Sequence, residues 1–225
     1  MKLSILSFTA TAAVALMATA AQAGPGFIIA PIAATVDVNG PGFGSITNTF
    51  DESGLSSLYT PGVTNFDAYI ATNPLHTTTF SGFEFFGNAG TSTLQVTYDL
   101  GSVKSINALA LWNEESSGIG SLTLLSSLDG ITFSLFAAGL TPFDNPLAPY
   151  PAEVFGFGNL STRYVRFEAS GCPQPNPGNF ASCAIGEVAF RTGSATVPEP
   201  QSWALMIAGF GLVGAAMRRR ASVVA

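Results

Sequence analysis

Short segments in which apolar and polar residues alternate recur along the middle of the chain. In residues 94–100, leucine, valine and tyrosine alternate with glutamine, threonine and aspartate, and residues 164–169 alternate in the same way. A period of two is typical of a strand with one buried face. Residues 106–112 are almost continuously apolar, which predicts a strand covered on both faces, and residues 185–191 supply a closing strand.

Turn signals separate these segments. Gly101-Ser102 is predicted to turn the chain, and Asp129-Gly130 lies between residues 122–126 and 132–136, which predicts a β-hairpin. No long stretch combines a helical spacing of apolar residues with capping residues. Many short strands separated by turns favour an all-β fold, a β-sandwich or jelly roll.

The first 23 residues have the pattern of a secretory signal peptide. Lys2 precedes an apolar run over residues 3–20, and Ala21-Gln22-Ala23 has the small-x-small pattern of a cleavage site. We therefore expect signal peptidase to cut before Gly24 and the chain to be exported. A retained N-terminal anchor or a buried helix is the alternative.

Near the C-terminus, residues 203–217 form an uncharged apolar run that ends at Arg218-Arg219-Arg220. A helix over this run would span about 22 Å, which is short of the roughly 30 Å hydrocarbon core of a bilayer. A core helix is therefore one alternative. Trp203 at one end and the arginines at the other favour a short transmembrane helix with residues 221–225 in the cytoplasm.

The segment 197–220 resembles the PEP-CTERM sorting signal of Gram-negative bacteria. The resemblance rests on Val197-Pro198-Glu199-Pro200, the apolar run and Arg218-Arg219-Arg220. It implies recognition by an exosortase, a membrane protease that removes the tail, and delivery to the cell surface or extracellular matrix. The protein would then contact the membrane only through a removable helix. A plain linker before an ordinary anchor is the alternative.

Removal of both ends leaves residues 24–196, which is enough for one domain with its own core. This part contains thirteen carboxylates and only four basic residues, namely Lys104, Arg163, Arg166 and Arg191. Nucleic-acid binding requires clustered lysine and arginine, so this composition argues against a nucleic-acid partner.

The two cysteines, Cys172 and Cys183, lie in a segment rich in proline, asparagine and glycine. Neither a C-x-x-C spacing nor partner histidines accompany them, so a zinc site is not indicated. In an exported protein a disulfide is favoured, and closing a loop of this length contributes roughly 2–3 kcal/mol.

The order of segments from residue 94 to residue 191 resembles discoidin-like domains of the coagulation-factor C-terminal type. The matching segments are residues 94–106, 111–113, 126–133, 163–167 and 185–188. The resemblance implies a galactose-binding-like jelly roll whose loops at one end bind carbohydrate or lipid headgroups. Some members hold a structural calcium, which by position would involve Asp51 and Glu187, and hard oxygen ligands fit calcium. No other cofactor is expected.

Candidate ligand-binding residues are few. Trp112, Asn113 and Glu114 combine an aromatic ring with polar groups at a predicted strand end, which suits a ligand site. A core tryptophan followed by a solvated acidic loop is the alternative. His76, the single histidine, is a further candidate, although a solvent-facing loop position is favoured because no nucleophile motif accompanies it.

These patterns predict an exported β-sandwich that binds exopolysaccharide and is not an enzyme. A structural protein of a biofilm or floc matrix, without a specific sugar ligand, is the second hypothesis. A glycan hydrolase is the third, because any two of the thirteen carboxylates could pair in space as glycoside hydrolysis requires.

Overall fold

The computed structural model describes residues 26–79, 81–174, 180–193 and Phe210. Contacts group residues 24–196 into one compact unit, and apart from Phe210 every described residue belongs to it. The predicted signal peptide and, apart from Phe210, the predicted sorting tail lie outside the described residues. In the described part, no helix has the length and apolar character needed to cross a membrane.

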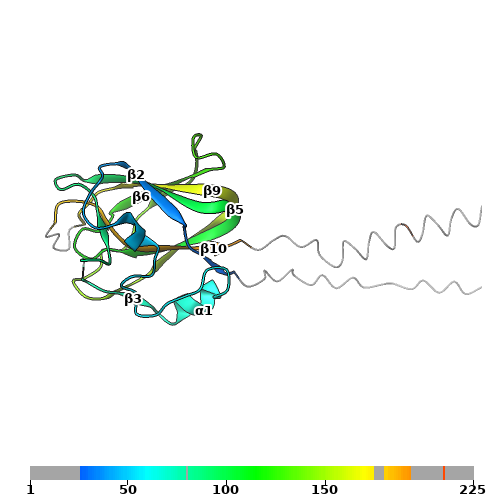
Figure 1. Ribbon diagram of the computed structural model, residues 1–225, viewed down its shortest axis with the longest axis horizontal. Coiled ribbons are helices and arrows are strands. Elements are labelled where there is room, and N and C mark those ends of the chain that lie inside the picture. The colour runs from blue at the N-terminus through cyan, green and yellow to red at the C-terminus, as the bar shows by residue number, and fades with distance from the viewer. Residues whose placement is uncertain (1–25, 80, 175–179, 194–209, 211–225) are drawn as a thin grey trace, which may run out of the picture. The chain divides into compact units, whose positions relative to one another are not determined.

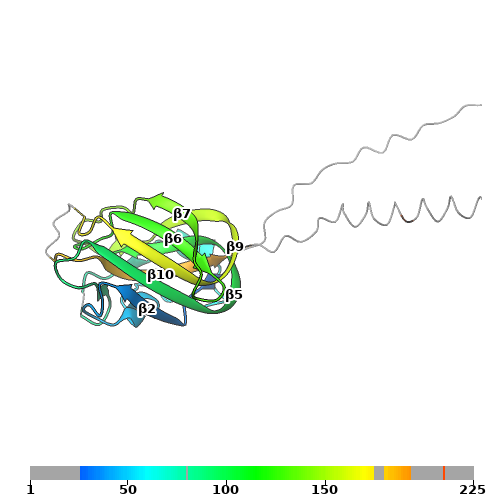
Figure 2. The same ribbon diagram turned by 90° about the horizontal axis from the view of Figure 1, so that it is seen from above.

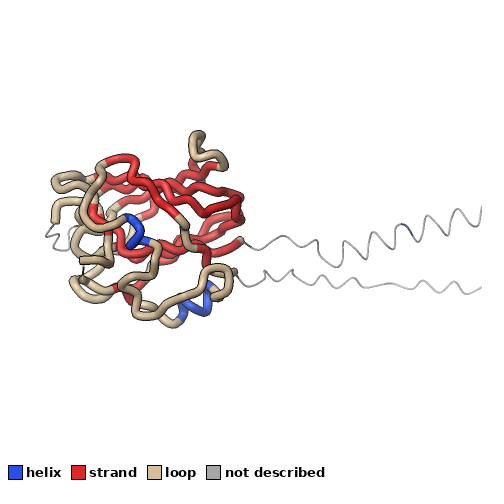
Figure 3. The backbone as a smooth tube through the Cα atoms, viewed as in Figure 1, coloured by secondary structure: helices blue, strands red, loops and turns tan. Residues whose placement is uncertain are grey.

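Strands dominate the described part of the chain (Figures 1 and 3). The strands are β1 (Ile28–Ile29), β2 (Ala33–Val38), β3 (Leu75–His76), β4 (Phe85–Phe86), β5 (Thr93–Asn113), β6 (Ser121–Ser127), β7 (Ser134–Leu140), β8 (Tyr150–Pro151), β9 (Glu153–Ser170) and β10 (Ala184–Thr192). The helices of this part are short, namely the 3-10 helix η1 (Ile46–Thr49) and α1 (Phe66–Ala71). The predicted all-β fold is confirmed.

Two long antiparallel strands, β5 and β9, are shared by both layers of the sandwich. The first half of β5 pairs with β2 and with the end of β9, whereas its second half pairs with β10 and with the beginning of β9. β6 and β7 extend the first layer, as Figure 2 shows. In the second layer, β1 and β4 pair with β10. This arrangement is the jelly-roll β-sandwich that the sequence predicts.

The turn predicted at Gly101-Ser102 is instead a bulge within β5. The pairing of β5 with β9 shifts register between Asp99 and Lys104, and the strand continues on the other side. Gly101 has a φ of 80° and its N–H donates to Asp99 Oδ1 at 2.7 Å. The left-handed φ is accessible to glycine without steric cost, so the residue that signalled a turn bends a continuous strand.

The core between the layers follows the alternation of the sequence. Val96 and Tyr98 of β5 and Val165 and Phe167 of β9 are fully buried. The ring of Tyr98 packs edge-to-face on Phe167 with ring centroids 5.0 Å apart, and its hydroxyl lies 3.1 Å from Thr49 Oγ1. The predicted faces of both strands are therefore confirmed.

The predicted hairpin and disulfide are also present. β6 and β7 pair on either side of the loop that contains Asp129-Gly130. Asp129 Oδ1 closes this loop by accepting the backbone N–H groups of Ile131 and Thr132 at 2.8 and 2.9 Å. A disulfide joins Cys172, after β9, to Cys183, before β10, and both residues are buried.

Candidate ligand-binding site

A hollow of about 550 Å³ lies among the loops at the end of the sandwich where β10 begins. Its volume falls within the range of small-molecule sites, about 300–1,000 Å³. β4 pairs with the start of β10 there, whereas β1 pairs with the opposite end of β10. The residues that line the hollow are Phe43, Thr78, Phe86, Glu114, Glu115, Ser116, Leu147 and Phe180.

Three phenylalanines form apolar walls of this hollow. Phe43 and Phe180 are 53% and 39% exposed, so both rings present apolar surface to solvent. Phe86 of β4 is buried and meets Phe180 edge-to-face, with ring centroids 5.5 Å apart. The loop that carries Phe43 is fixed to β4 because Phe43 and Phe86 exchange two backbone hydrogen bonds of 2.7 and 2.8 Å.

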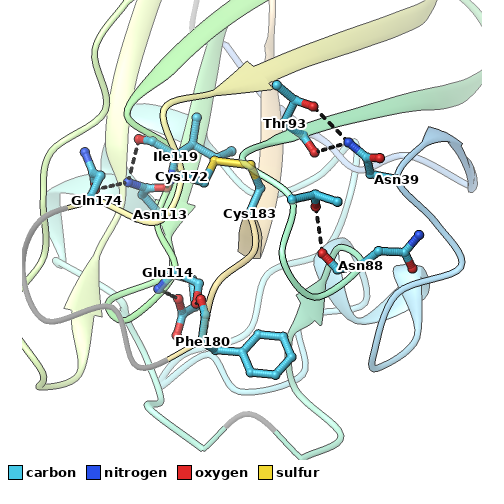
Figure 4. Close-up of a disulfide and its surroundings, with 12 residues drawn as sticks. Asn39, Asn88, Thr93, Asn113, Glu114, Ile119, Cys172, Gln174, Phe180 and Cys183 are labelled. Carbon is cyan, nitrogen blue, oxygen red and sulfur yellow. Dashed lines mark hydrogen bonds between the residues drawn. A yellow bond between two sulfur atoms is a disulfide. The ribbon is translucent and has the colours of Figure 1, made fainter.

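Phe180 is held in place by the segment that the disulfide closes. Ser117 Oγ donates to the Phe180 carbonyl at 2.6 Å, and the Ser182 N–H donates to the same oxygen at 2.8 Å. Figure 4 shows Phe180 and Glu114 in one view with the bond between Cys172 and Cys183, and Phe180 lies three residues before Cys183. The disulfide therefore supports one wall of the hollow.

Carboxylates form the polar part of the site. Glu114 accepts hydrogen bonds from Ser116 N–H at 2.9 Å, from Ser116 Oγ at 2.7 Å and from Ser117 N–H. Burial raises the pKa of Glu114, and burial together with the neighbouring Glu114 charge raises the pKa of Glu115 to about 8. Glu84 lies beneath them, fully buried, and accepts the Tyr150 hydroxyl at 2.6 Å.

Trp112 and Asn113, both predicted to bind ligand, belong to the scaffold. Trp112 is fully buried and its Nε1 donates to the Pro74 carbonyl at 2.9 Å, so it is a core tryptophan, as the alternative states. The solvated acidic loop of the same alternative is wrong, because Glu114 and Glu115 are 2% and 6% exposed. Asn113 ties the loop together, since its Oδ1 accepts Ile119 N–H at 2.8 Å and its Nδ2 donates to Gln174 Oε1 at 2.9 Å (Figure 4). The third predicted residue of this group, Glu114, does line the hollow.

His76 is buried, contrary to the predicted solvent-facing position. Its Nδ1 lies 2.9 Å from the Thr77 carbonyl and its Nε2 lies 3.1 Å from the Ser53 carbonyl. The ring also packs on Tyr150, with centroids 5.2 Å apart. Both ring nitrogens lie within hydrogen-bond distance of backbone carbonyls and the residue is 0% exposed, so the fold encloses the ring on both sides.

The predicted calcium pair, Asp51 and Glu187, is only partly assembled. Glu187 is fully buried, and its Oε1 accepts the Tyr59 hydroxyl at 3.0 Å; burial raises its pKa well above the usual range. Its Oε2 is buried without a hydrogen-bond partner, which suits a cation. Asp51 is exposed and accepts Ser53 N–H at 3.0 Å, while the adjacent Glu52 accepts Tyr59 N–H at 2.6 Å. A calcium ion at this position stays a prediction, and the surroundings of Glu187 suit such an ion better than those of Asp51.

The sequence did not indicate Phe43, Phe180 or Leu147 as site residues. Phe43 lies between two glycines and Phe180 lies inside the disulfide loop. An aromatic residue within a turn-rich segment is the one sequence signal that could have indicated them. The residues of the sorting motif, Val197-Pro198-Glu199-Pro200 and Arg218-Arg219-Arg220, lie outside the described residues.

Residues 196–220 match the PEP-CTERM protein-sorting motif, which confirms the resemblance of the tail. No curated protein matches the chain.

Among solved structures, the chain is similar to carbohydrate-binding modules. A chitosan-binding module of a chitosanase/glucanase from Paenibacillus sp. IK-5 is 18% identical over 72% of this chain and 96% of that chain, with a TM-score of 0.47. The CBM32 of AlyQ, in complex with 4,5-unsaturated mannuronic acid, is 17% identical over 72% and 96%, with a TM-score of 0.46. CBM32-5 of a Clostridium perfringens protein, in complex with GalNAc-β-1,3-galactose, is 15% identical over 70% and 93%, with a TM-score of 0.45. The chain thus combines a PEP-CTERM sorting motif with a jelly-roll sandwich that is similar to these modules.

Proposed function

We propose that this protein is an exported, non-catalytic carbohydrate-binding protein that holds exopolysaccharide in the hollow between Phe43 and Phe180. The observation that carries the proposal is the combination of phenylalanine rings and carboxylates around one hollow of suitable size. The apolar face of a sugar ring packs on an aromatic ring, and sugar hydroxyls form hydrogen bonds with carboxyl groups.

Binding is tested with the purified protein on a glycan array and on the exopolysaccharide of the producing organism. Phe180→Ala removes one wall, and truncation of a central aromatic contact costs more than about 1 kcal/mol, so we expect roughly tenfold weaker binding. Ile131→Ala is the matched control, because Ile131 is 84% exposed and belongs to the β6–β7 loop outside the hollow. Equal losses in both variants, or no glycan bound by the unmodified protein, would contradict the proposal.

The sorting motif supports a route of export for this activity. The motif implies a protein that is exported and held in the membrane before cleavage. We propose that an exosortase cuts near Pro198-Glu199-Pro200 and releases the domain to the cell surface or matrix. Intact-mass analysis of the secreted protein should show loss of residues 1–23 and of the tail beyond this motif. Retention of Arg218 would show that the tail is not removed.

Two further hypotheses predict different outcomes in the same experiments. A matrix protein without a specific sugar ligand would support biofilm or floc cohesion equally well with Phe180→Ala. A glycan hydrolase would release new reducing ends from a bound glycan, and Glu115→Gln would abolish the release. We expect cohesion to fall with Phe180→Ala and no reducing ends to form.

A further inference from the structure

Three buried carboxylates converge beneath the hollow. Glu84, Glu114 and Glu115 each bring one carboxylate oxygen within 4.8 Å of the others. Their residues are 0%, 2% and 6% exposed. Glu84 precedes β4 and the other two follow β5, so the group is assembled from distant parts of the chain.

Two oxygens of this group are buried without a hydrogen-bond partner, namely Glu84 Oε2 and Glu115 Oε2. The remaining oxygen of Glu84 accepts the Tyr150 hydroxyl, and both oxygens of Glu114 accept from the Ser116–Ser117 segment. A buried carboxylate oxygen without a partner is costly, because water that would solvate it has been removed. Each orphaned oxygen therefore needs an electropositive partner, which is either a proton or a cation.

The basic side chains of the described residues do not supply this partner to Glu114 or Glu115. The three arginines in this part of the chain form ion pairs elsewhere, with Asp99, Asp37 and Asp67. Lys104 lies in the middle of β5 opposite Thr162, ten residues before Glu114. The basic group beside the cluster is His76, whose Nδ1 lies 3.5 Å from Glu84 Oε1. That nitrogen faces the Glu84 oxygen that already accepts from Tyr150, and not the orphaned Oε2.

We propose that Glu84, Glu114 and Glu115 bind a divalent cation of the calcium class. Calcium takes oxygen ligands at about 2.4 Å, so two oxygens on opposite sides of one ion lie about 4.8 Å apart. The three carboxylate oxygens already lie within that separation. Calcium requires six to eight oxygens, and three carboxylates leave positions for further oxygen ligands.

The open positions of the cation face the hollow, because Glu114 and Glu115 line it. Hydroxyl or carboxylate oxygens of a bound glycan can complete the coordination in place of water. This second part rests on the proposed function, whereas the cation site itself does not. The two parts are therefore measured separately.

The cation site is tested by titrating calcium into the chelator-treated, full-length protein by calorimetry, with terbium luminescence as a second probe. We expect Glu115→Gln to remove one bound calcium, or to weaken it at least tenfold, and to abolish the calcium-dependent rise in melting temperature. Glu168→Gln is the control, because Glu168 is an exposed acid on β9. Glu187→Gln shows whether any of the measured calcium is bound at Glu187 and not at the three-glutamate cluster. Should Glu115→Gln fail to fold, Glu84→Gln serves in its place.

Unchanged calcium stoichiometry and affinity in Glu115→Gln and Glu84→Gln would overturn the cation site. So would a complete absence of calcium binding by the unmodified protein. Glycan affinity is then measured in calcium and in chelator, and we expect at least a tenfold loss in chelator. Calcium bound without any glycan bound would overturn the proposed function and leave the cation site standing. Equal glycan affinity in both buffers would overturn only the bridging role.

Discussion

Reduction of the disulfide between Cys172 and Cys183 tests how strongly the loop end depends on its cross-link. Reduction breaks one covalent bond and removes no heavy atom, so it does not create the cavity that truncation of a side chain would. The two cysteines are 11 residues apart. In the chain-entropy treatment a cross-link of this span restricts the denatured chain by about 2.8 kcal/mol at 25 °C.

This magnitude predicts a clear shift in stability. For a domain of 150–250 residues, about 2.8 kcal/mol lowers the melting temperature by roughly 6–11 °C. Because Phe180 lies inside the closed loop, its ring loses part of its support, and glycan binding in the hollow should weaken as well.

The assay is urea unfolding of the oxidised and the reduced protein, followed by circular dichroism. The free energies of unfolding are compared and not the midpoints alone, because a cross-linked denatured chain is more compact and has a smaller denaturant slope. A loss below 1 kcal/mol would refute the reasoning. It would show that the cross-link restricts the denatured chain much less than the chain-entropy treatment gives.

Three further predictions concern individual residues. Trp112→Phe removes the donor to the Pro74 carbonyl and should cost about 1–3 kcal/mol in urea unfolding, with glycan affinity of the folded protein unchanged. Gly101→Ala places a Cβ on a residue with a φ of 80°, which should lower the free energy of unfolding by roughly 1–2 kcal/mol. The new methyl group lies 2.9 Å from Ile32 Cδ1, the end of a side chain that can move aside. Equal free energies of unfolding for the variant and the unmodified protein would contradict the bulge. Backbone hydrogen bonds lower the pKa of Asp129 to about 2 from its usual 3.8, so its carboxylate stabilises the fold above about pH 4 and that contribution is lost as pH falls through 2. We therefore expect Asp129→Asn to have a lower melting temperature than the unmodified protein at pH 5, and the difference between the two melting temperatures to shrink as pH falls to 2. A difference that stays constant over this range would contradict the prediction.

The strands could be predicted because their signal is local. The alternation in β5 and β9 is set by one buried face, and Asp129-Gly130 marks the hairpin with its own side chain and backbone. The bulge at Gly101 could not be distinguished from a turn, because glycine suits both. What decides between them is the pairing of β5 with β9 on both sides of the bulge, which is a long-range interaction.

The candidate site was predictable only in part for the same reason. A strand end carrying Glu114 suggested a ligand site, and Glu114 does line the hollow. The walls assemble through distant contacts, such as the backbone pairing of Phe43 with Phe86 and the disulfide that holds Phe180. The burial of His76 likewise depends on carbonyls 1 and 23 residues away and on the ring of Tyr150.

The position of β10, which begins beside the hollow and ends at Thr192, has a mechanical consequence. β10 has nine residues, so it separates its two ends by about 30 Å. A pull between a glycan in the hollow and the segment that follows Thr192 is directed along this strand. Its hydrogen bonds to β5 run across that direction, so they are loaded in shear and must break together and not one after another. A domain with this geometry is expected to resist tension along β10 better than tension across it.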